Sequence, residues 1–417
     1  MPASDTVELR GHLLDSGVLT KVLDDIRDYG GDYVIDRFEV GKDHDDESYA
    51  RVAVTMGDDE GLVRLLMRLQ GHGANPAGDQ GDAVLREADA DGVFPEDFYS
   101  TTNLETVVRL EGRWVPVDRP EMDCGLVVGA DPASGGEVRV RTVPVSDVRR
   151  GDLVVCGAGG VRVVPLPAER PEVAGFAFMD SDVSSEKPQA LLVRQIAQQM
   201  RDVKGEGRRI LWVAGPAVVH TGAAPAMVAL VEAGFVDVLF AGNALATHDI
   251  EAALYGTSLG VDLSRGKGVE HGHEHHIRAI NTIRRAGSIA AAVEQGVLTS
   301  GVMHALVRAG GEAVLVGSVR DDGPLPDVRT DVVEGQRAMR AQLHDVGFAI
   351  MVATMLHSVA TGNILPASVP LVCVDINPAT VTKLADRGSS QARGIVTDIG
   401  LFLEQLALEL VPGYTRP

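Results

Sequence analysis

The sequence is poor in several features that would narrow its function. Aromatic residues make up only 4% of its 417 residues, so aliphatic side chains must fill the core. There are only three cysteines, Cys124, Cys156 and Cys373, and their wide spacing argues against a disulfide framework or a zinc ribbon. No run of about 18 apolar residues occurs, so no membrane-spanning helix is expected. The first residues lack the basic and apolar regions of a signal peptide, and we expect a cytoplasmic protein.

Basic residues are also scarce relative to acidic ones. The chain has 38 Lys and Arg against 59 Asp and Glu, a formal net charge of −21. Such a surface repels the phosphates of nucleic acids and anionic lipids, so partners of these two classes are not expected. A small-molecule substrate is therefore the more plausible partner.

The pattern along the chain predicts three parts. Residues 1–95 mix helical and strand patterns and form a small α+β domain. Residues 96–183 are rich in short alternating runs and predict a β-rich domain or hinge on the substrate side. In residues 184–417, helical segments alternate with apolar strands, which predicts an α/β domain with a doubly wound parallel sheet. Here we expect strands at 209–214, 236–241, 313–318, 371–376 and 394–396, and a long helical region over 332–362.

The glycine-rich fingerprint that usually opens a dinucleotide-binding sheet is missing. The nearest match, residues 157–162, leads into a strand rather than a helix, and we interpret it as a hairpin turn. The apolar strand 371–376, in contrast, carries Asp375 near its end, where dinucleotide-binding sheets hydrogen-bond a ribose diol. An ordinary strand-capping Asp is the alternative. A carboxylate there favours NAD over NADP, because it repels a 2′-phosphate.

Other loops that follow expected strands carry small or polar residues. Residues 215–222 and 242–249 contain glycine and alanine, which allow a ligand to approach the backbone, although routine turn chemistry would look the same. Residues 317–326 combine Arg, Asp and Pro in a stiff loop that suits a polar site, and a surface turn is the alternative. Sites in such sheets lie at the carboxyl ends of the strands, where all three loops would meet.

Two further clusters are candidates for substrate chemistry. Residues 271–276 contain four histidines, but they lack the spacing of a zinc site, so we expect no metal. Work on the substrate, proton transfer and a solvated helix start remain open for them. Residues 98–103 and 121–124 concentrate hydroxyl, amide and carboxylate groups that could hold an amino acid. Cys124 could equally be a small buried hydrophobic residue.

Together these strings resemble one family over nearly the whole chain: the archaeal-type ornithine cyclodeaminases, also found as the C-terminal part of cyanobacterial arginine dihydrolase/ornithine cyclodeaminases. The N-terminal part of that family is related to a region shared with bifunctional lysine-ketoglutarate reductase/saccharopine dehydrogenase. The resemblance is carried by residues 98–103, 121–124, 215–222, 242–251, 256–260, 272–281, 317–326 and 374–378. The chain lacks the arginine-removing domain of the fusions, so arginine dihydrolysis is not implied.

The resemblance implies that NAD binds to the C-terminal domain, in a fold similar to deoxyhypusine synthase that lacks the glycine fingerprint. The residues implied to contact the cofactor are Asn243, Ala244, Asp322, Thr354, Met355, Leu356, His357, Asp375, Thr397 and Asp398. The resemblance does not settle the catalytic residues. From amine chemistry we nominate His276 as the base, because His titrates near neutral pH, with Asp123 holding the substrate ammonium group and Cys124 beside it.

The expected activity is the conversion of ornithine to proline and ammonia with a recycled NAD, in a homo-oligomer that we expect to be a dimer. Two other classes compete with it: a net NAD-dependent dehydrogenase of the saccharopine or lysine type, and an NAD-responsive regulatory protein. A synthase like deoxyhypusine synthase is disfavoured, because it needs a lysine and none lies at an expected strand end.

Overall fold

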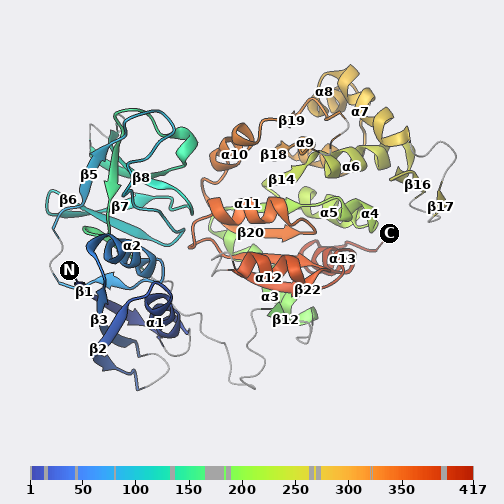
Figure 1. The fold of residues 1–417 in the computed structure, drawn as a ribbon. Coiled ribbons are helices and arrows are strands. Elements are labelled where there is room, and N and C mark those ends of the chain that lie inside the picture. Colours follow the sequence, from blue (N-terminus) through green and yellow to red (C-terminus); the bar gives the residue numbers. More distant parts are fainter. Residues whose placement is uncertain are drawn as a thin grey trace. The chain divides into compact units, whose positions relative to one another are not determined.

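The computed structural model describes residues 2–13, 17–42, 46–78, 81–131, 137–164, 183–184, 189–262, 267–268, 274–319, 321, 323–386 and 392–416. The chain forms two compact units, Met1–Glu172 with Asn363–Ser368, and Val173–Gly362 with Val369–Pro417. Figure 1 shows the elements of both. The division into three parts at residues 95 and 183 stays a prediction.

The first unit begins with a four-stranded antiparallel sheet covered by two helices. Its strands, in the order β2-β3-β1-β4, are β1 (Ala3–Gly11), β2 (Asp32–Glu39), β3 (Ser48–Met56) and β4 (Asn75–Pro76). The helices α1 (Val18–Asp28) and α2 (Asp59–Gln70) bury apolar residues such as Val22 and Leu65 at helical spacing. These side chains pack with Val52 and Val54, alternate residues of β3, as expected for a sheet with one buried face.

A seven-stranded sheet completes this unit, in the order β11-β6-β7-β9-β8-β10-β5. Its strands are β5 (Val84–Glu87), β6 (Thr106–Leu110), β7 (Arg113–Asp118), β8 (Gly125–Asp131), β9 (Glu137–Val143), β10 (Leu153–Cys156) and β11 (Val161–Val163). The hairpin expected at residues 157–162 is wrong. The glycine turn does connect β10 and β11, but β10 pairs with β5 and β8, whereas β11 pairs with β6.

The second unit is built on an eight-stranded sheet in which every pairing is parallel. In spatial order its strands are β12 (Val183–Ser184), β22 (Ala392–Val396), β21 (Leu371–Asp375), β20 (Val346–Val352), β13 (Arg209–Ala214), β14 (Val238–Gly242), β18 (Glu312–Val316) and β19 (Val328–Arg329). The central strands are almost wholly buried, which explains their continuous apolar runs. The predicted α/β class with a doubly wound parallel sheet, preceded by a smaller α+β and β-rich region, is confirmed.

The direction of chain progression reverses in the middle of this sheet. The chain builds β13, then β14 and β18 on one side of it, and then returns to place β20 on the other side of β13. Ligands of open α/β sheets bind outside the carboxyl ends of the strands at such a reversal. A ligand is therefore expected at the loops that follow β13 and β20.

Helices cover the sheet. They are α3 (Gln189–Gly205), α4 (Ala217–His220), α5 (Ala224–Glu232), α6 (Asn243–Tyr255), α7 (His275–Ala286), α8 (Ile289–Glu294), α9 (Val302–Ala309), α10 (Val332–Ala341), α11 (Leu356–Ile364), α12 (Pro378–Asp386) and α13 (Ile399–Leu410). Buried residues of α3, α5, α9 and α13 share one apolar core with the sheet, and Figure 1 shows α11 and α12 on its near side. A small sheet, β15 (Thr257–Ser258), β16 (Val261–Asp262) and β17 (Lys267–Gly268), follows α6. Among the described residues, no helix combines the length and apolar character needed to cross a membrane.

Three sequence expectations in this unit are wrong. Residues 215–222 are not wholly a loop, because α4 lies within them. The region 332–362 is not one helical stretch, because β20 lies in its middle, between α10 and α11. A short apolar run cannot be assigned to a buried strand or a buried helix by periodicity alone. Residues 243–249 do not form a loop either, because α6 begins at Asn243, directly after β14.

Candidate functional site

The loops after β13 and β20 touch at the reversal of the sheet. A Cβ atom added to Gly215, just after β13, would lie 1.9 Å from the carbonyl oxygen of Ala353, just after β20. Ala353 itself has a φ of 53°, a left-handed conformation that few side chains adopt. Only glycine at position 215 allows the two backbones to come this close, so the contact depends on the sequence.

Asn243 ties the loop after β18 to the start of α6. It is buried, and its Oδ1 accepts hydrogen bonds from the backbone N–H of Leu325, at 3.0 Å, and from the hydroxyl of Thr247, at 3.3 Å. Ala244, the other cofactor candidate here, is the next helical residue and is half-buried. Asn243 therefore has a structural role in addition to the one expected of it.

His357, which follows β20, lies close to the end of β14 and to Asp321 in the loop after β18. It lies in the first turn of α11, and its Cε1 is 3.3 Å from the position of a Cβ on Gly242, at the end of β14. Burial lowers the pKa of His357, while the carboxylate of Asp321 and a hydrogen bond to the backbone of Ala241 act in the opposite direction. The expected contact residue Asp322 lies outside the described residues.

The residues between Ala353 and His357, which join β20 to the start of α11, differ in exposure. Thr354 is half-buried, whereas Met355 and Leu356 are exposed, Leu356 by 75% of its surface. An exposed leucine and methionine beside the carboxyl edge of a parallel sheet offer apolar surface to a ligand.

Asp375, Thr397 and Asp398 lie at the carboxyl ends of β21 and β22. Asp375 ends β21 and is 8% exposed, and its Oδ1 accepts the N–H of Asn377 at 2.8 Å. No described residue bonds its other oxygen. Thr397 follows β22 and donates its N–H to the carbonyl of Asp375 at 3.2 Å. Asp398 is exposed and caps α13 by accepting the N–H of Leu401 at 2.9 Å.

In the first unit, the two polar strings of the β-rich region come together. The hydroxyl of Thr101 donates to the carbonyl of Glu121, at 2.6 Å, and accepts the N–H of Cys124, at 3.1 Å. Cys124 is buried, with its Sγ 4.0 Å from a carboxylate oxygen of Glu121. Asp123 is exposed in a left-handed conformation, with a φ of 58°. Of this pair, Asp123 is thus the side chain open to a ligand.

The segment Asn363–Ser368 belongs to this same unit. The carbonyl of Asn363 accepts the N–H of Met122 at 2.8 Å, and the N–H of Ala367 donates to the carbonyl of Asn103 at 2.7 Å. The Asn103 amide also donates to the carbonyl of Leu365 at 3.2 Å. These bonds anchor the turn that carries Asp123 and Cys124.

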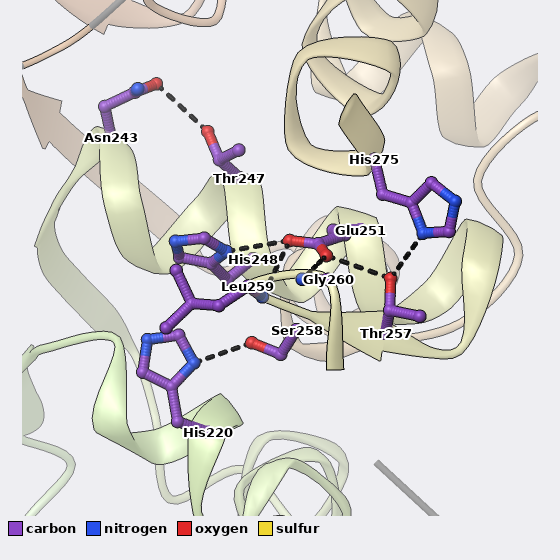
Figure 2. A network of polar contacts seen from close by, with 10 residues as sticks. All are labelled: His220, Asn243, Thr247, His248, Glu251, Thr257, Ser258, Leu259, Gly260 and His275. Atoms are coloured by element: carbon purple, nitrogen blue, oxygen red, sulfur yellow. Dashed lines mark hydrogen bonds and ion pairs between the residues drawn. The ribbon is translucent and has the colours of Figure 1, made fainter. Parts of the chain in front are cut away.

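A buried polar network on α6 was missed by the sequence analysis (Figure 2). Glu251 is fully buried, and its two oxygens accept hydrogen bonds from the hydroxyl of Thr257, at 2.9 Å, and the N–H groups of Gly260, at 3.0 Å, and Leu259, at 3.3 Å. The Nδ1 of His248 lies 2.8 Å from Oε2. Burial alone would raise the pKa of Glu251, but the hydrogen bonds from His248, Gly260 and Thr257 outweigh it, and the pKa is lowered.

Two more imidazoles complete this network. His220, the last residue of α4, contacts the hydroxyl of Ser258 through Nδ1 at 2.6 Å, and its ring meets that of His248 edge to face with centroids 4.8 Å apart. Nδ1 of His275 lies 2.8 Å from the hydroxyl of Thr257. From the histidine cluster near the start of α7 the structure therefore brings His275 into the network. The nominated His276 is the next residue and is half-buried.

The spacing of residues 243, 247 and 251 was the signal that could have revealed this network. Polar side chains four residues apart lie on one face of a helix. The signal was hidden because residues 243–249 were interpreted as a loop. The partners of Glu251 at positions 257–260 come from a separate element, which periodicity does not place.

Asp249, on the same helix, has a structural role that predicts a pH effect. Its buried carboxylate accepts the N–H groups of Val302 and Met303, both at 2.8 Å, and so caps α9. Burial raises the pKa of Asp249 to about 6 from the ordinary 3.8. As the pH rises from about 4 to 6, the unfolded chain ionises this group while the folded chain retains the proton, so stability falls, by about 3 kcal/mol, and then levels off. Urea unfolding of the protein and of the Asp249→Asn variant should differ in this pH window, and parallel curves would contradict the assignment.

Comparison with known proteins shows which families this chain is similar to. Residues 194–406 match a family described as arginine dihydrolase ArgZ-like, C-terminal, Rossmann fold. Residues 105–193 match the first region of the same C-terminal part, and residues 4–104 match the LOR/SDH bifunctional enzyme conserved region. The ornithine cyclodeaminase of Methanothermobacter thermautotrophicus is 54% identical over 404 residues, which cover 97% of each chain.

This chain belongs to the ornithine cyclodeaminase family.

Solved structures of ArgZ-like proteins are also similar to this chain. The crystal structure of cyanobacterial ArgZ superposes with a TM-score of 0.84 at 37% identity over 98% of this chain, which spans 58% of the ArgZ chain. The ternary complex of AgrE with ornithine and NAD⁺ is 40% identical over 98% of this chain, with a TM-score of 0.52, and the chain spans 57% of AgrE. The resemblance drawn from the sequence strings is confirmed.

Proposed function

We propose that this protein is an NAD-dependent ornithine cyclodeaminase, which converts ornithine to proline and ammonia. The observation that carries the proposal is end-to-end identity of 54% with an archaeal ornithine cyclodeaminase. The crystal structure of the related AgrE with both ornithine and NAD⁺ supports the substrate and the cofactor. The chain is thus proposed to be a small-molecule enzyme.

The carboxyl edge of the parallel sheet fits NAD. Gly215 lets the loop after β13 pack directly against Ala353, so the loops after β13 and β20 meet at the carboxyl edge, where ligands of such sheets bind. Asp375, a residue only 8% exposed, offers a carboxylate oxygen that no described residue bonds, which suits the hydroxyls of a ribose. The cofactor residues proposed are Asn243, Ala244, Asp322, Thr354, Met355, Leu356, His357, Asp375, Thr397 and Asp398.

The chemistry then divides between cofactor and protein. When bound, NAD⁺ accepts a hydride from Cα of ornithine and later returns it to the ring carbon. The protein must orient the substrate, exclude water and move protons. Two protons leave the two ammonium groups of ornithine, and two are returned, one to the ring nitrogen and one to the departing ammonia. The overall reaction therefore consumes no net proton and no net cofactor.

The nominated catalytic residues Asp123, Cys124 and His276 stay predictions. Replacement of His276 by Ala is expected to cut turnover, by about 10²-fold or more if His276 is a general base, while NAD binding stays near that of the parent protein. The measurement is steady-state turnover beside NAD titration by fluorescence. Unchanged turnover would remove His276 from the mechanism.

The activity is tested by incubating the protein with ornithine and a catalytic amount of NAD⁺. Proline and ammonia in equal amounts without accumulation of NADH are expected. NADH that rises with product would instead establish a net dehydrogenase. Bound NAD with no reaction of ornithine or other diamines would support the regulatory alternative.

Two further properties belong to the same proposal. We expect the protein to act in the cytoplasm and to form a homo-oligomer, with a dimer as the first expectation. Sedimentation of the purified protein measures the second property directly.

A further inference from the structure

The network around Glu251 lies partly on helices that begin at the carboxyl edge of the sheet. α6 begins directly at the end of β14, α4 follows β13, and the two helices are in contact. His248 is five residues from Asn243, about 8 Å along the helix axis. That separation is comparable to the length of one extended amino-acid substrate. The network is therefore placed on the side of the sheet where ligands bind.

The buried carboxylate sets the chemical state of His248. Because Glu251 lies 2.8 Å from Nδ1, the neutral imidazole carries its proton on Nδ1 and keeps Nε2 as an acceptor. No described residue bonds Nε2, and the side chain of His248 remains 11% exposed. Glu251 is itself held by three further hydrogen bonds, so the carboxylate cannot turn away. His248 is thus an oriented imidazole with a free acceptor nitrogen.

The neighbours of His248 allow it to gain a charge. Glu251 on its own helix would balance an imidazolium at His248. His220 from α4 faces it, and burial, followed by the proximity of His248, lowers the pKa of His220, which disfavours a positive charge there. His275 from α7 reaches the network only through Thr257. Glu251 would therefore balance a proton on His248, and a second positive charge at His220 is disfavoured.

We propose that His248, oriented by Glu251, accepts and returns protons at the nitrogen atoms of the substrate. The inference rests on the proposed cyclodeamination. Nε2 takes a proton from an ammonium group of ornithine, which frees the nitrogen lone pair, and the resulting imidazolium is stabilised by Glu251. The proton then passes to the departing ammonia, which returns His248 to its starting state. Glu251 acts as a positioning residue, and the carboxylate does not change its charge.

The first test replaces His248 by Ala in the full-length protein, with His344→Ala as control. His344 is an exposed histidine that precedes β20, at the opposite edge of the sheet. We expect His248→Ala to lower kcat by about 10²- to 10⁴-fold, while NAD binding, measured by fluorescence titration, changes less than about threefold. Added imidazole should restore part of the activity of His248→Ala, an effect that a purely structural role would not produce. The control should keep the turnover of the parent protein.

The second test addresses Glu251. In Glu251→Gln the side-chain amide can donate to Nδ1, so the proton of the neutral imidazole moves to Nε2 and the acceptor is lost. We expect a kcat loss of about 10²-fold or more with NAD binding retained, and Glu251→Asp should recover part of it. If His248→Ala fails to fold, as judged by circular dichroism, His248→Gln takes its place, since a glutamine keeps a polar group near Glu251.

The outcomes separate this inference from the proposed function. If the parent protein forms no proline from ornithine, the proposed activity itself fails. If the parent protein is active and the folded His248 variant keeps turnover within about threefold, the role of His248 is overturned. A loss of turnover that imidazole does not restore and that is accompanied by loss of NAD binding would also overturn it, in favour of a structural role.

Discussion

Replacing Asp375 with Asn is expected to weaken NAD binding by about 10- to 100-fold. Hydrogen bonds to a charged acceptor contribute about 1.5–3 kcal/mol, and each 1.4 kcal/mol corresponds to a factor of ten in affinity. The amide retains one acceptor for the N–H of Asn377, so the turn after β21 should survive. Removal of the negative charge should also weaken discrimination against NADP, because the 2′-phosphate is no longer repelled.

The strand order gives the physical reason for this expectation. β20, α11 and β21 form a strand-helix-strand unit that begins at the reversal of the sheet, and Asp375 ends its second strand. In the usual dinucleotide-binding half, the phosphate-binding turn follows the first strand. The acidic residue that binds the ribose lies at the end of the second strand. The corresponding position of the other half, at the end of β14, is Gly242, followed by Asn243. The acidic ribose ligand is therefore expected on the β20–β21 half of this sheet.

The measurement is a titration of NAD and NADP against the parent protein and the variant. Asp345→Asn is a matched control, since Asp345 is exposed, has a left-handed φ of 57° that asparagine tolerates, and precedes β20 at the other edge of the sheet. Equal NAD affinities for the Asp375 variant and the control would show that Asp375 only caps its strand.

Replacing Gly215 with Ala is expected to have the other large effect. The new Cβ would lie 1.9 Å from the carbonyl oxygen of Ala353 and 2.8 Å from its carbon, so the backbone at the reversal must move. Overpacking of this kind costs about 1–3 kcal/mol, and more where backbone rather than a side chain must yield. We expect a lower unfolding midpoint and at least about a tenfold loss of NAD affinity.

Gly205→Ala is the control for this substitution. Gly205 ends α3, and nothing lies within 4 Å of a Cβ added there, so alanine should be neutral or slightly stabilising. Thermal unfolding and NAD titration of the two variants separate the local clash from a general effect of alanine. A Gly215→Ala protein that behaves like the control would mean that the two loops can separate at little cost.

The sequence predicted the strands of the second unit well where turn residues bounded an apolar run. β13 and β21 are examples: Gly215 and Pro216 follow the first, and Asn377 and Pro378 follow the second. β20 was missed because its residues, Val346–Val352, lie between two helical segments and their apolar run fits a buried helix as well as a buried strand. Without β20 the reversal of the sheet could not be located.

The candidate site was predictable only in part for a similar reason. Asp375 could be named from its place at a strand end, because a parallel sheet gathers the ends of its strands at one edge, whereas Asn243 was named through the family resemblance. Glu251 could not, since its significance arises from hydrogen bonds to residues 257–260 and from complete burial. The four-residue spacing of Asn243, Thr247 and Glu251 indicates a shared helix face, but it predicts neither these hydrogen bonds nor the burial. Sequence reasoning therefore reached the carboxyl edge of the sheet but not the buried network on α6.

The segment Asn363–Ser368 also affects how the protein is made. A ribosome produces the chain from residue 1 onward, and domains usually fold in that order. The first unit, however, includes six residues that are synthesised only after most of the second unit. Until then, the carbonyl of Asn363 is not available to the N–H of Met122, nor the N–H of Ala367 to the carbonyl of Asn103. The turn that carries Asp123 and Cys124 would thus acquire its final anchors late in translation, when β20 and α11 have already emerged.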